Sequence, residues 1–329
     1  MSGSPPTVSV VIPTRQRLRS LLAVLEALER QDHPAELLET VVVADGDPAT
    51  AAALRGRPGL RVLEQPHGGP AAARNLGIRS AGAEVILFID DDVVPSPWCV
   101  RRHAEAHASR PDLAVIGPLL PPRDGAWASP WVRWEARTLQ RQYSDIEAGR
   151  WRATARQFYT GNASVRRDHL VGLDGFNTSL RRAEDVELGF RLRDRGLSFD
   201  FLPEATAYHE AERRYRSWVW AAREYGRVDA MMATEMGRPE VLEWAASEFH
   251  GRHPLTRSAI VHCLRHPALS SALCAAAAPL ARAALRCGGG PVSDRLCGGV
   301  FNVLYWQGVR QQLGEEPAVT LRMIDRARP

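Results

Sequence analysis

Apolar runs alternate with amphipathic stretches along the first part of the chain. Four short runs, rich in valine, isoleucine and leucine, have the pattern of strands buried in a sheet. They lie at residues 8–12, 40–44, 60–64 and 85–89, the third being the weakest. Helical spacing follows over residues 18–29 and again over 71–80, after a Gly-Gly-Pro turn. This order predicts a parallel α/β sheet, in which ligands bind beyond the carboxyl ends of the strands.

Acidic side chains follow two of these predicted strands. Asp45 comes at the end of the second run, and Asp90, Asp91 and Asp92 come directly after the fourth. Neighbouring carboxylates repel one another unless a cation or hydrogen-bond donors neutralise them, and carboxylate oxygens suit Mg²⁺ or Mn²⁺. Residues i and i+2 of a strand face one side, so Asp90 and Asp92 can share a ligand. The structural alternatives are a solvated acidic turn and, for Asp45, a turn-forming aspartate before glycine.

Two helices carry further charged candidates. Arg74 lies in the helix predicted over 71–80, where it can reach a phosphate or pin an aspartate; otherwise it is an exposed arginine. Apolar residues at i,i+4 spacing over 181–196 predict a second helix with Glu184 and Asp185 at its start. The helix dipole favours ionised carboxylates there, and an ionised carboxylate can take a proton from an acceptor hydroxyl. Ordinary helix N-terminal charge is the structural alternative.

His209 is a candidate third protein ligand for Mn²⁺, although an isolated histidine is more often structural. The composition narrows the chemistry further. All 42 basic residues are arginine, which excludes mechanisms that need a Schiff-base or Walker-type lysine. The net charge of +4 gives no nucleic-acid footprint. Five widely spaced cysteines without a C-x-x-C pair, and an N-terminus unlike a signal peptide, favour a reduced cytoplasmic compartment.

Together, the order and spacing of these segments resemble glycosyltransferase family 2, an inverting family with the GT-A fold. The resemblance covers about residues 7–210. It is carried by VSVVIPTRQR, VVVADGDPA, GGPAAARNLGI, ILFIDDDVVP and TGNASVRRDHLVGLDGFNTSLRRAEDVELGFRLRDRG. It implies a Rossmann-like mixed sheet flanked by helices, with a helical C-terminal extension. The segment ADGD departs from the family's DDGS pattern, which puts the contacts with the nucleobase in doubt.

The resemblance implies a UDP-, GDP- or dTDP-sugar donor, a divalent metal (Mn²⁺ or Mg²⁺) and a role for each matching residue. Asp185 would be the general base, with Glu184 as its less favoured substitute. The donor site would be formed by Pro13, Thr14, Arg15, Asp45, Arg74, Asp90 and Asp91. The metal would be held by Asp92, Asp90 and His209. The acceptor side would be lined by Gly161 and Asn162, with Trp131 and Trp134 as aromatic candidates.

The mechanism implied is one in-line displacement at the anomeric carbon. The Q-x-x-R-W element of processive polysaccharide synthases is absent, which predicts transfer of one sugar rather than polymerisation. The acceptor stays unknown. Two rival classes are weaker. A sugar nucleotidyltransferase would need a G-x-G-T-R loop and a lysine, and a non-catalytic glycan-binding scaffold has no reason to retain Asp92, Asp185 and His209.

The remaining sequence predicts how the chain is divided. Residues 1–250 are expected to form the transferase domain, with a donor half over about 1–120 and an acceptor half over about 121–250; residues 251–329 are expected to form a helical region. A middle segment gathers large aromatics, which suit either an acceptor or a core: Trp127, Trp131, Trp134, Tyr143 and Trp151. The apolar run over 268–285 predicts a buried or interdomain helix, with peripheral membrane contact as the sharper alternative.

Overall fold

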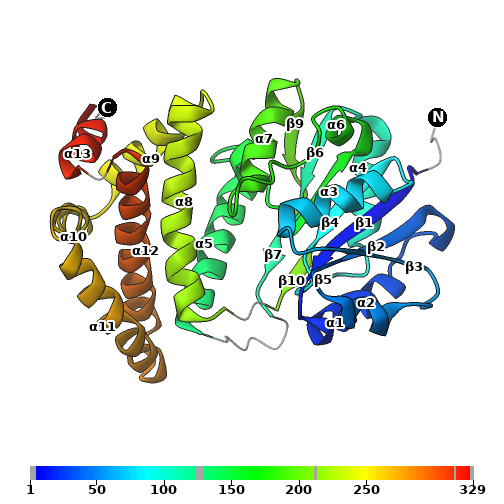
Figure 1. Ribbon diagram of the computed structural model, residues 1–329, viewed down its shortest axis with the longest axis horizontal. Helices are drawn as coiled ribbons and strands as arrows, with labels where there is room; N and C mark the ends of the chain where they lie inside the picture. The colour runs from blue at the N-terminus through cyan, green and yellow to red at the C-terminus, as the bar shows by residue number, and fades with distance from the viewer. Residues whose placement is uncertain (1–4, 123–128, 211–212, 315, 327–329) are drawn as a thin grey trace. The chain divides into compact units, whose positions relative to one another are not determined.

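The computed structural model describes residues 5–122, 129–210, 213–314 and 316–326 (Figure 1). The chain forms two compact units. Unit 1 comprises Met1–Ala126 and Ala136–Ala211, and unit 2 comprises Trp127–Glu135 and Glu212–Pro329. The predicted division near residue 250 falls inside unit 2, between α9 (Pro239–Gly251) and α10 (Pro254–Arg265). The assignment of donor and acceptor halves stays a prediction.

Unit 1 is built on a seven-stranded sheet in the order β3-β2-β1-β4-β8-β6-β9 (Figure 1). The first four strands in chain order pair in parallel, which confirms the predicted α/β pattern. β8 runs antiparallel to both of its neighbours, so the sheet is mixed. The strands are β1 (Val8–Thr14), β2 (Leu38–Asp45), β3 (Leu60–Gln65), β4 (Val85–Ile89), β6 (Leu113–Ile116), β8 (Asn162–Arg166) and β9 (Ser198–Phe201).

Helices cover this sheet, and a second, small sheet begins with the strand that follows β4 in the chain. The helices are α1 (Leu18–Glu29), α2 (Pro48–Leu54), α3 (Pro70–Ser80), α4 (Cys99–Ser109), α6 (Arg167–Val171) and α7 (Glu184–Asp194). The small sheet has the order β5 (Val93–Pro95), β10 (Ala207–His209), β7 (Leu119–Leu120). β10 and β5 are antiparallel, and their register pairs His209 with Val93. Val93 directly follows Asp90, Asp91 and Asp92, called the aspartate triplet below. A distant segment of the chain is thereby brought to the end of β4.

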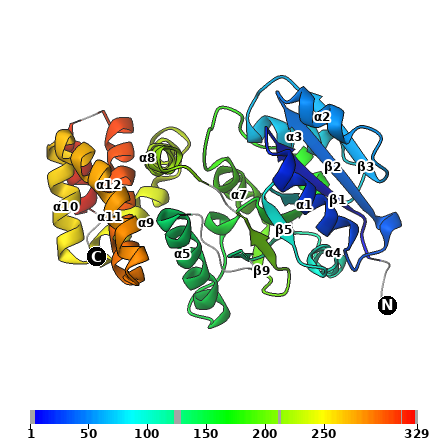
Figure 2. The ribbon, with the colours of Figure 1, turned by 90° about the horizontal axis from the view of Figure 1, so that it is seen from below.

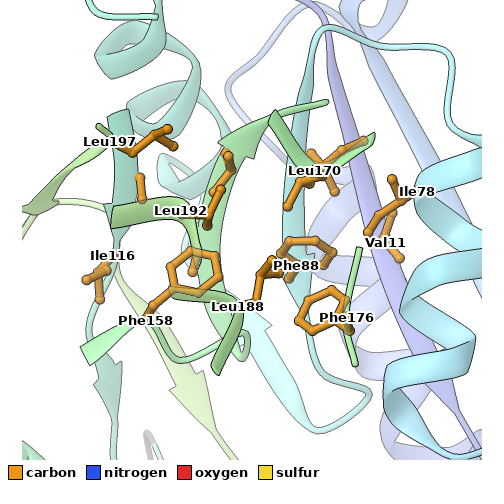
Figure 3. Packing of buried hydrophobic residues seen from close by; sticks show 14 of the residues in the cluster. Val11, Ile78, Phe88, Ile116, Phe158, Leu170, Phe176, Leu188, Leu192 and Leu197 are labelled. Carbon is orange, nitrogen blue, oxygen red and sulfur yellow. The ribbon is translucent and has the colours of Figure 1, made fainter. Parts of the chain in front are cut away.

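Both faces of the large sheet are buried, as the continuous apolar runs require. Successive residues of a strand point to opposite faces, so β4 sends Val85, Leu87 and Ile89 to one core cluster and Ile86 and Phe88 to the other. Figure 3 shows Phe88 in the second cluster, near Phe176 and Leu188. The rings of Phe88 and Phe176 meet edge to face, with centroids 5.2 Å apart. This contact ties the loop before α7 to the central strand.

Unit 2 is helical in the described residues, which confirms the predicted helical C-terminal region. It contains α8 (Tyr215–Glu235), α9, α10, α11 (Pro267–Arg286), α12 (Gly290–Gln312) and α13 (Pro317–Arg326), and it includes the first turns of α5 (Pro130–Glu147). α8 and α12 approach closely where Gly226 faces the carbonyl of Tyr305 and Gly308 faces the carbonyl of Arg223. A Cβ atom at either glycine would overlap backbone, so both positions require glycine.

We predict that Gly308→Ala destabilises unit 2 by about 3 kcal/mol, because the two helix backbones must separate to admit the methyl group. Gly299→Ala is the matched control, since it lies in the same helix and its Cβ would meet open space. The control should be neutral or slightly stabilising, because alanine has the higher helix propensity. Urea unfolding followed by circular dichroism measures both. Equal midpoints for the two variants would contradict the close packing.

Candidate active site at the carboxyl edge of the central sheet

The aspartate triplet is neutralised largely by arginines of the protein itself. Arg17, in the loop between β1 and α1, places Nη1 at 2.9 Å from Oδ1 of Asp91 and 2.7 Å from Oδ2 of Asp92. Thr14 Oγ1 donates a second bond to Asp91, at 2.8 Å. Burial lowers the pKa of Arg17, but the two carboxylates outweigh it and raise that pKa, so the guanidinium is permanently charged. Arg17 and Thr14 therefore relieve the repulsion expected between Asp91 and Asp92.

The two buried aspartates titrate differently. Burial raises the pKa of Asp91 to about 6, against the opposing effect of Arg17. Burial also disfavours the charged form of Asp92, but His209 and Arg17 outweigh it and hold the pKa of Asp92 well below its usual range. Asp92 is therefore the member of this pair that is ionised throughout the neutral range.

Asp92 and His209 form the part of the predicted metal set that the structure brings together. Oδ1 of Asp92 lies 3.6 Å from Nε2 of His209, while Oδ2 is occupied by Arg17. Asp90 does not join them, because its carboxylate pairs with Arg74. The described residues contain no group of three His, Cys, Asp or Glu arranged to hold an ion. A carboxylate and an imidazole nonetheless suit Mn²⁺, and such ions commonly take one or two protein ligands together with substrate phosphates.

Arg74 joins the triplet to the acidic start of α7. Its Nη2 lies 2.7 Å from Oδ1 of Asp90, and its Nη1 lies 2.8 Å from Oε1 of Glu184. The Arg74 side chain is 6% exposed, and its guanidinium lies 5.7 Å from the ring centroid of Phe176. Of the alternatives weighed for Arg74, the structure shows the one in which it pins an aspartate. In doing so it brings the two predicted acidic sites together.

The orientation of α3 is what allows Arg74 to make this bridge. The helix begins after Gly69, whose φ of 87° is available to glycine, and Pro70 supplies the first helical position. One turn on, the Asn75 side chain donates to the Phe176 carbonyl at 2.8 Å and accepts from its N–H at 2.7 Å. Those two bonds fix α3 against the loop that leads into α7.

Glu184 and Asp185 both lie at the start of α7. Among the described contacts, Asp185 forms no ion pair with an arginine. Its Oδ1 accepts from the N–H of Val186 at 2.8 Å and its Oδ2 from the N–H of Thr160 at 3.4 Å. Burial raises the pKa of Asp185, and the neighbouring charge of Glu184 raises it further, against the opposing effect of Arg74. A raised pKa suits a group that must accept a proton near neutral pH. Glu184, paired with Arg74, is the less available carboxylate.

The backbone of Thr160 and Gly161 lies between Asp185 and the triplet. Thr160 contacts Asp185, and a Cβ built on Gly161 would lie 3.5 Å from Oδ2 of Asp90. Gly161 is thus next to the predicted site, within van der Waals distance of the Asp90 carboxylate. The role of Thr160 was not predicted, because a backbone N–H leaves no signal in the sequence.

Asp45 supports a loop rather than presenting a free carboxylate. It is 4% exposed, and each of its oxygens accepts two hydrogen bonds. The donors are Gln65 Nε2 (2.8 Å), His67 Nδ1 (2.7 Å), Gly68 N (2.7 Å) and Gly69 N (2.9 Å). Burial disfavours the ionised form, but these bonds outweigh it and lower the pKa of Asp45. Asp45 therefore fixes the turn that starts α3, and its capacity to accept a bond from a nucleobase is already filled.

Two residues near Asp45 are exposed, Arg15 and His67, and they lie in different loops. The His67 side chain is 52% exposed, and its Nε2 lies 3.1 Å from Nη1 of Arg15. Arg15 was predicted at the donor site; His67 was not, although it precedes the Gly-Gly turn that Asp45 organises. Pro13, the remaining predicted donor residue, lies in β1 opposite Val43 of β2.

Of the predicted acceptor residues, Asn162 and Trp131 are buried and Trp134 is half-buried. Asn162 is fully buried, and its amide donates to the carbonyls of Pro118 (3.1 Å) and Ala205 (2.7 Å). Trp131 and Trp134 belong to unit 2. Trp131 is 2% exposed and donates to the Arg213 carbonyl at 2.7 Å, and Trp134 packs on Trp218 and Phe301. Both tryptophans thus pack within unit 2, and contact of either with an acceptor stays a prediction; Trp127 lies outside the described residues.

Known structures share this fold. The chain resembles the mannosyltransferase PcManGT of Pyrobaculum calidifontis, solved with GDP-Man and Mn²⁺, with a TM-score of 0.61 and 21% identity over 96% of this chain and 89% of that one. It also resembles S. aureus TarS 1-349 in complex with UDP, with a TM-score of 0.52 and 17% identity over 94% and 92%. The mixed sheet and its helices are therefore a GT-A fold, as the sequence predicted.

The family assignment rests on the sequence. The model of glycosyl transferase family 2 matches residues 9–173, about half of the chain, and the protein belongs to this family. It is 27% identical over 237 residues to the pre-mycofactocin glycosyltransferase of Mycobacterium tuberculosis, covering 69% of this chain and 47% of that protein. It is 28% identical over 222 residues to the validoxylamine A glucosyltransferase of Streptomyces hygroscopicus, covering 58% and 52%. The chain spans about half the length of these relatives.

We predict that Arg74→Met lowers the free energy of unfolding by about 3 kcal/mol, because it leaves the buried Glu184 without a counter-charge. Arg110→Met is the matched control. It removes an exposed ion pair with Asp200, whose loss should cost less than about 1 kcal/mol. Denaturant unfolding at neutral pH, followed by tryptophan fluorescence, compares the two. Similar losses for both variants would show that Arg74 does not hold the site together.

Proposed function

We propose that the protein transfers a single sugar from a nucleotide-activated donor to an acceptor nucleophile, with inversion at the anomeric carbon. The observation that supports this most is the Arg74 bridge, which places the acidic start of α7 next to the aspartate triplet. A base and a site for a diphosphate are then neighbours, as a single displacement requires. The GDP-Man and UDP bound by the two structural neighbours support a nucleotide-sugar donor.

Asp185 is the proposed base. The acceptor oxygen forms its bond to the anomeric carbon while the bond from that carbon to the diphosphate oxygen breaks, and the electron pair leaves with the nucleoside diphosphate. The acceptor proton passes to the Asp185 carboxylate. No covalent enzyme intermediate is required, and the sugar's configuration inverts because there is one displacement.

Asp92 and His209 are the proposed holders of a divalent ion, Mn²⁺ or Mg²⁺. When bound, the ion supplies positive charge next to the departing diphosphate. Arg17 holds Asp91 and Asp92 in place, and it keeps Oδ1 of Asp92 directed at His209 by occupying Oδ2. The nucleobase end of the donor is proposed to meet Arg15 and His67, since Asp45 has no free oxygen for it.

A reduced, cytoplasmic compartment is also proposed. All five cysteines are free, and four of them are buried. Burial raises the pKa of Cys99 and Cys297 to about 12, which keeps these thiols unreactive.

We predict that Asp92→Asn removes the metal-dependent part of donor stabilisation. A ligand at a hundred times its Kd stabilises a protein by about 2.7 kcal/mol, so the loss is measurable as a lower melting temperature. The measurement is a thermal-shift panel of UDP-, GDP- and dTDP-sugars with and without Mn²⁺. Asp200→Asn, on the exposed surface of β9, should behave as the unmodified protein does. A full Mn²⁺ response in Asp92→Asn would remove that residue from the metal site.

We predict that Asp185→Asn keeps donor binding but slows sugar release from the donor by about 10²- to 10⁴-fold. Because the pKa of Asp185 is raised, the carboxylate is ionised only above that pKa; the unmodified rate should fall as the pH is lowered through it, at a pH well above the ~4 of an ordinary aspartate. Metal-dependent hydrolysis of the donor, with water as acceptor, gives the rate at each pH. Retained turnover with an unchanged pH profile in the variant would refute the assignment.

A further inference from the structure

The segment from Phe249 to Ser293 in unit 2 differs in charge from the rest of the chain. It contains no aspartate or glutamate and five arginines, of which Arg252 pairs with Glu248 just before the segment: Arg252, Arg257, Arg265, Arg282 and Arg286. The whole chain has a net charge of +4, so the residues outside this segment carry a net charge of −1. The positive charge of the protein is thus concentrated on α10, α11 and the start of α12, which Figures 1 and 2 both show as neighbouring helices.

The helix α11 presents an apolar face to solvent within this segment. Among the described residues it is the one helix long and apolar enough to cross a membrane, yet only 28% of its apolar window is buried. Its outward positions follow at three- and four-residue spacing, all of them exposed and all apolar: Leu269, Ala272, Ala276, Leu280 and Ala283. Leu269 and Leu280 are 48% and 54% exposed.

The opposite face of α11 anchors it in unit 2. Ser270, Cys274 and Ala281 are buried there, and the Tyr215 hydroxyl donates to the Cys274 carbonyl at 2.7 Å. Arg282, the one charge inside the apolar run, has its guanidinium 4.9 Å from the Trp131 ring centroid, at the side of the helix. The helix is therefore held along the surface of unit 2 and is not available to cross a bilayer.

We propose that α10 and α11 form a docking surface for the interface of a membrane rich in anionic lipids. A helix that lies in the interface inserts an apolar face and is attracted by anionic headgroups through flanking basic residues. Here the exposed leucines supply the apolar face. Arg265, the last residue of α10, and Arg286, the last residue of α11, are exposed and lie within the acid-free segment. Leu255 of α10 is 75% exposed and adds to the apolar surface of the same segment. No residue of the segment itself carries a carboxylate side chain, which favours a negatively charged surface.

The test is flotation of the full chain with vesicles of phosphatidylcholine alone, or of phosphatidylcholine and phosphatidylglycerol in equal parts. We expect flotation with the anionic vesicles only, and its loss at high salt, because exposed charges are screened there. Leu269→Asp/Leu280→Asp and Arg265→Glu/Arg286→Glu should each lower the ratio of bound to free protein at least about tenfold. Circular dichroism and melting curves establish that both variants fold.

Matched control substitutions lie in unit 1. Val171→Asp changes an apolar side chain that is 50% exposed, and Arg30→Glu changes an exposed arginine. Both controls should float as the unmodified chain does. Equal flotation with neutral vesicles, or flotation that survives the α11 variants, would overturn the proposal. So would sedimentation showing a dimer that the leucine substitutions dissociate while no vesicle binding occurs, since the face would then pair with a second copy of the chain.

Discussion

The site depends on two arginines that compensate the negative charge gathered at one edge of the sheet. Arg17 holds Asp91 and Asp92, and Arg74 joins Asp90 to Glu184. Carboxylates this close and this buried cannot all ionise unless cations are fixed among them. A guanidinium suits the task because it is always charged and offers several donors in one plane, so that one side chain can bond carboxylates from different elements. The chain contains no lysine, so the permanently charged cationic side chains at this edge are arginines.

The backbone is strained where these charges are held. Three described residues other than glycine have positive φ angles: Gln16, Asp174 and Ala183. Gln16 lies between Arg15 and Arg17, and Ala183 directly precedes Glu184. Conformations of this kind cost about 1–3 kcal/mol each and persist only when surrounding contacts enforce them. At Gln16 such a contact is visible, because its N–H donates to the Asp47 carboxylate at 2.6 Å. The packing of unit 1 thus offsets the free-energy cost of these backbone conformations, and the neighbouring charged side chains are held in their orientations.

The fold was predictable because its signals are local. The run over 85–89 is β4 residue for residue, and the i,i+4 pattern after Glu184 is α7. The partners of the charged groups were not predictable in this way. His209 could be proposed as a metal ligand from its chemistry, but its approach to Asp92 could not be predicted, because it depends on the pairing of β10 with β5. Arg17 was missed because an arginine in a loop has no periodicity, and the burial of Asn162 was not predicted because a motif match does not reveal which way a side chain points.

The position of Asp45 was predicted correctly, but the contacts of its carboxylate were not. The sequence placed it at the end of β2, where a nucleobase contact was expected, and the structure has it there with four donors on its two oxygens. Because Asp45 is ionised, His67 must donate from Nδ1; its Nε2 is then the acceptor for Arg15. The carboxylate thereby sets the tautomer of His67, and through it the bond to Arg15, so that it joins the loops that carry these residues.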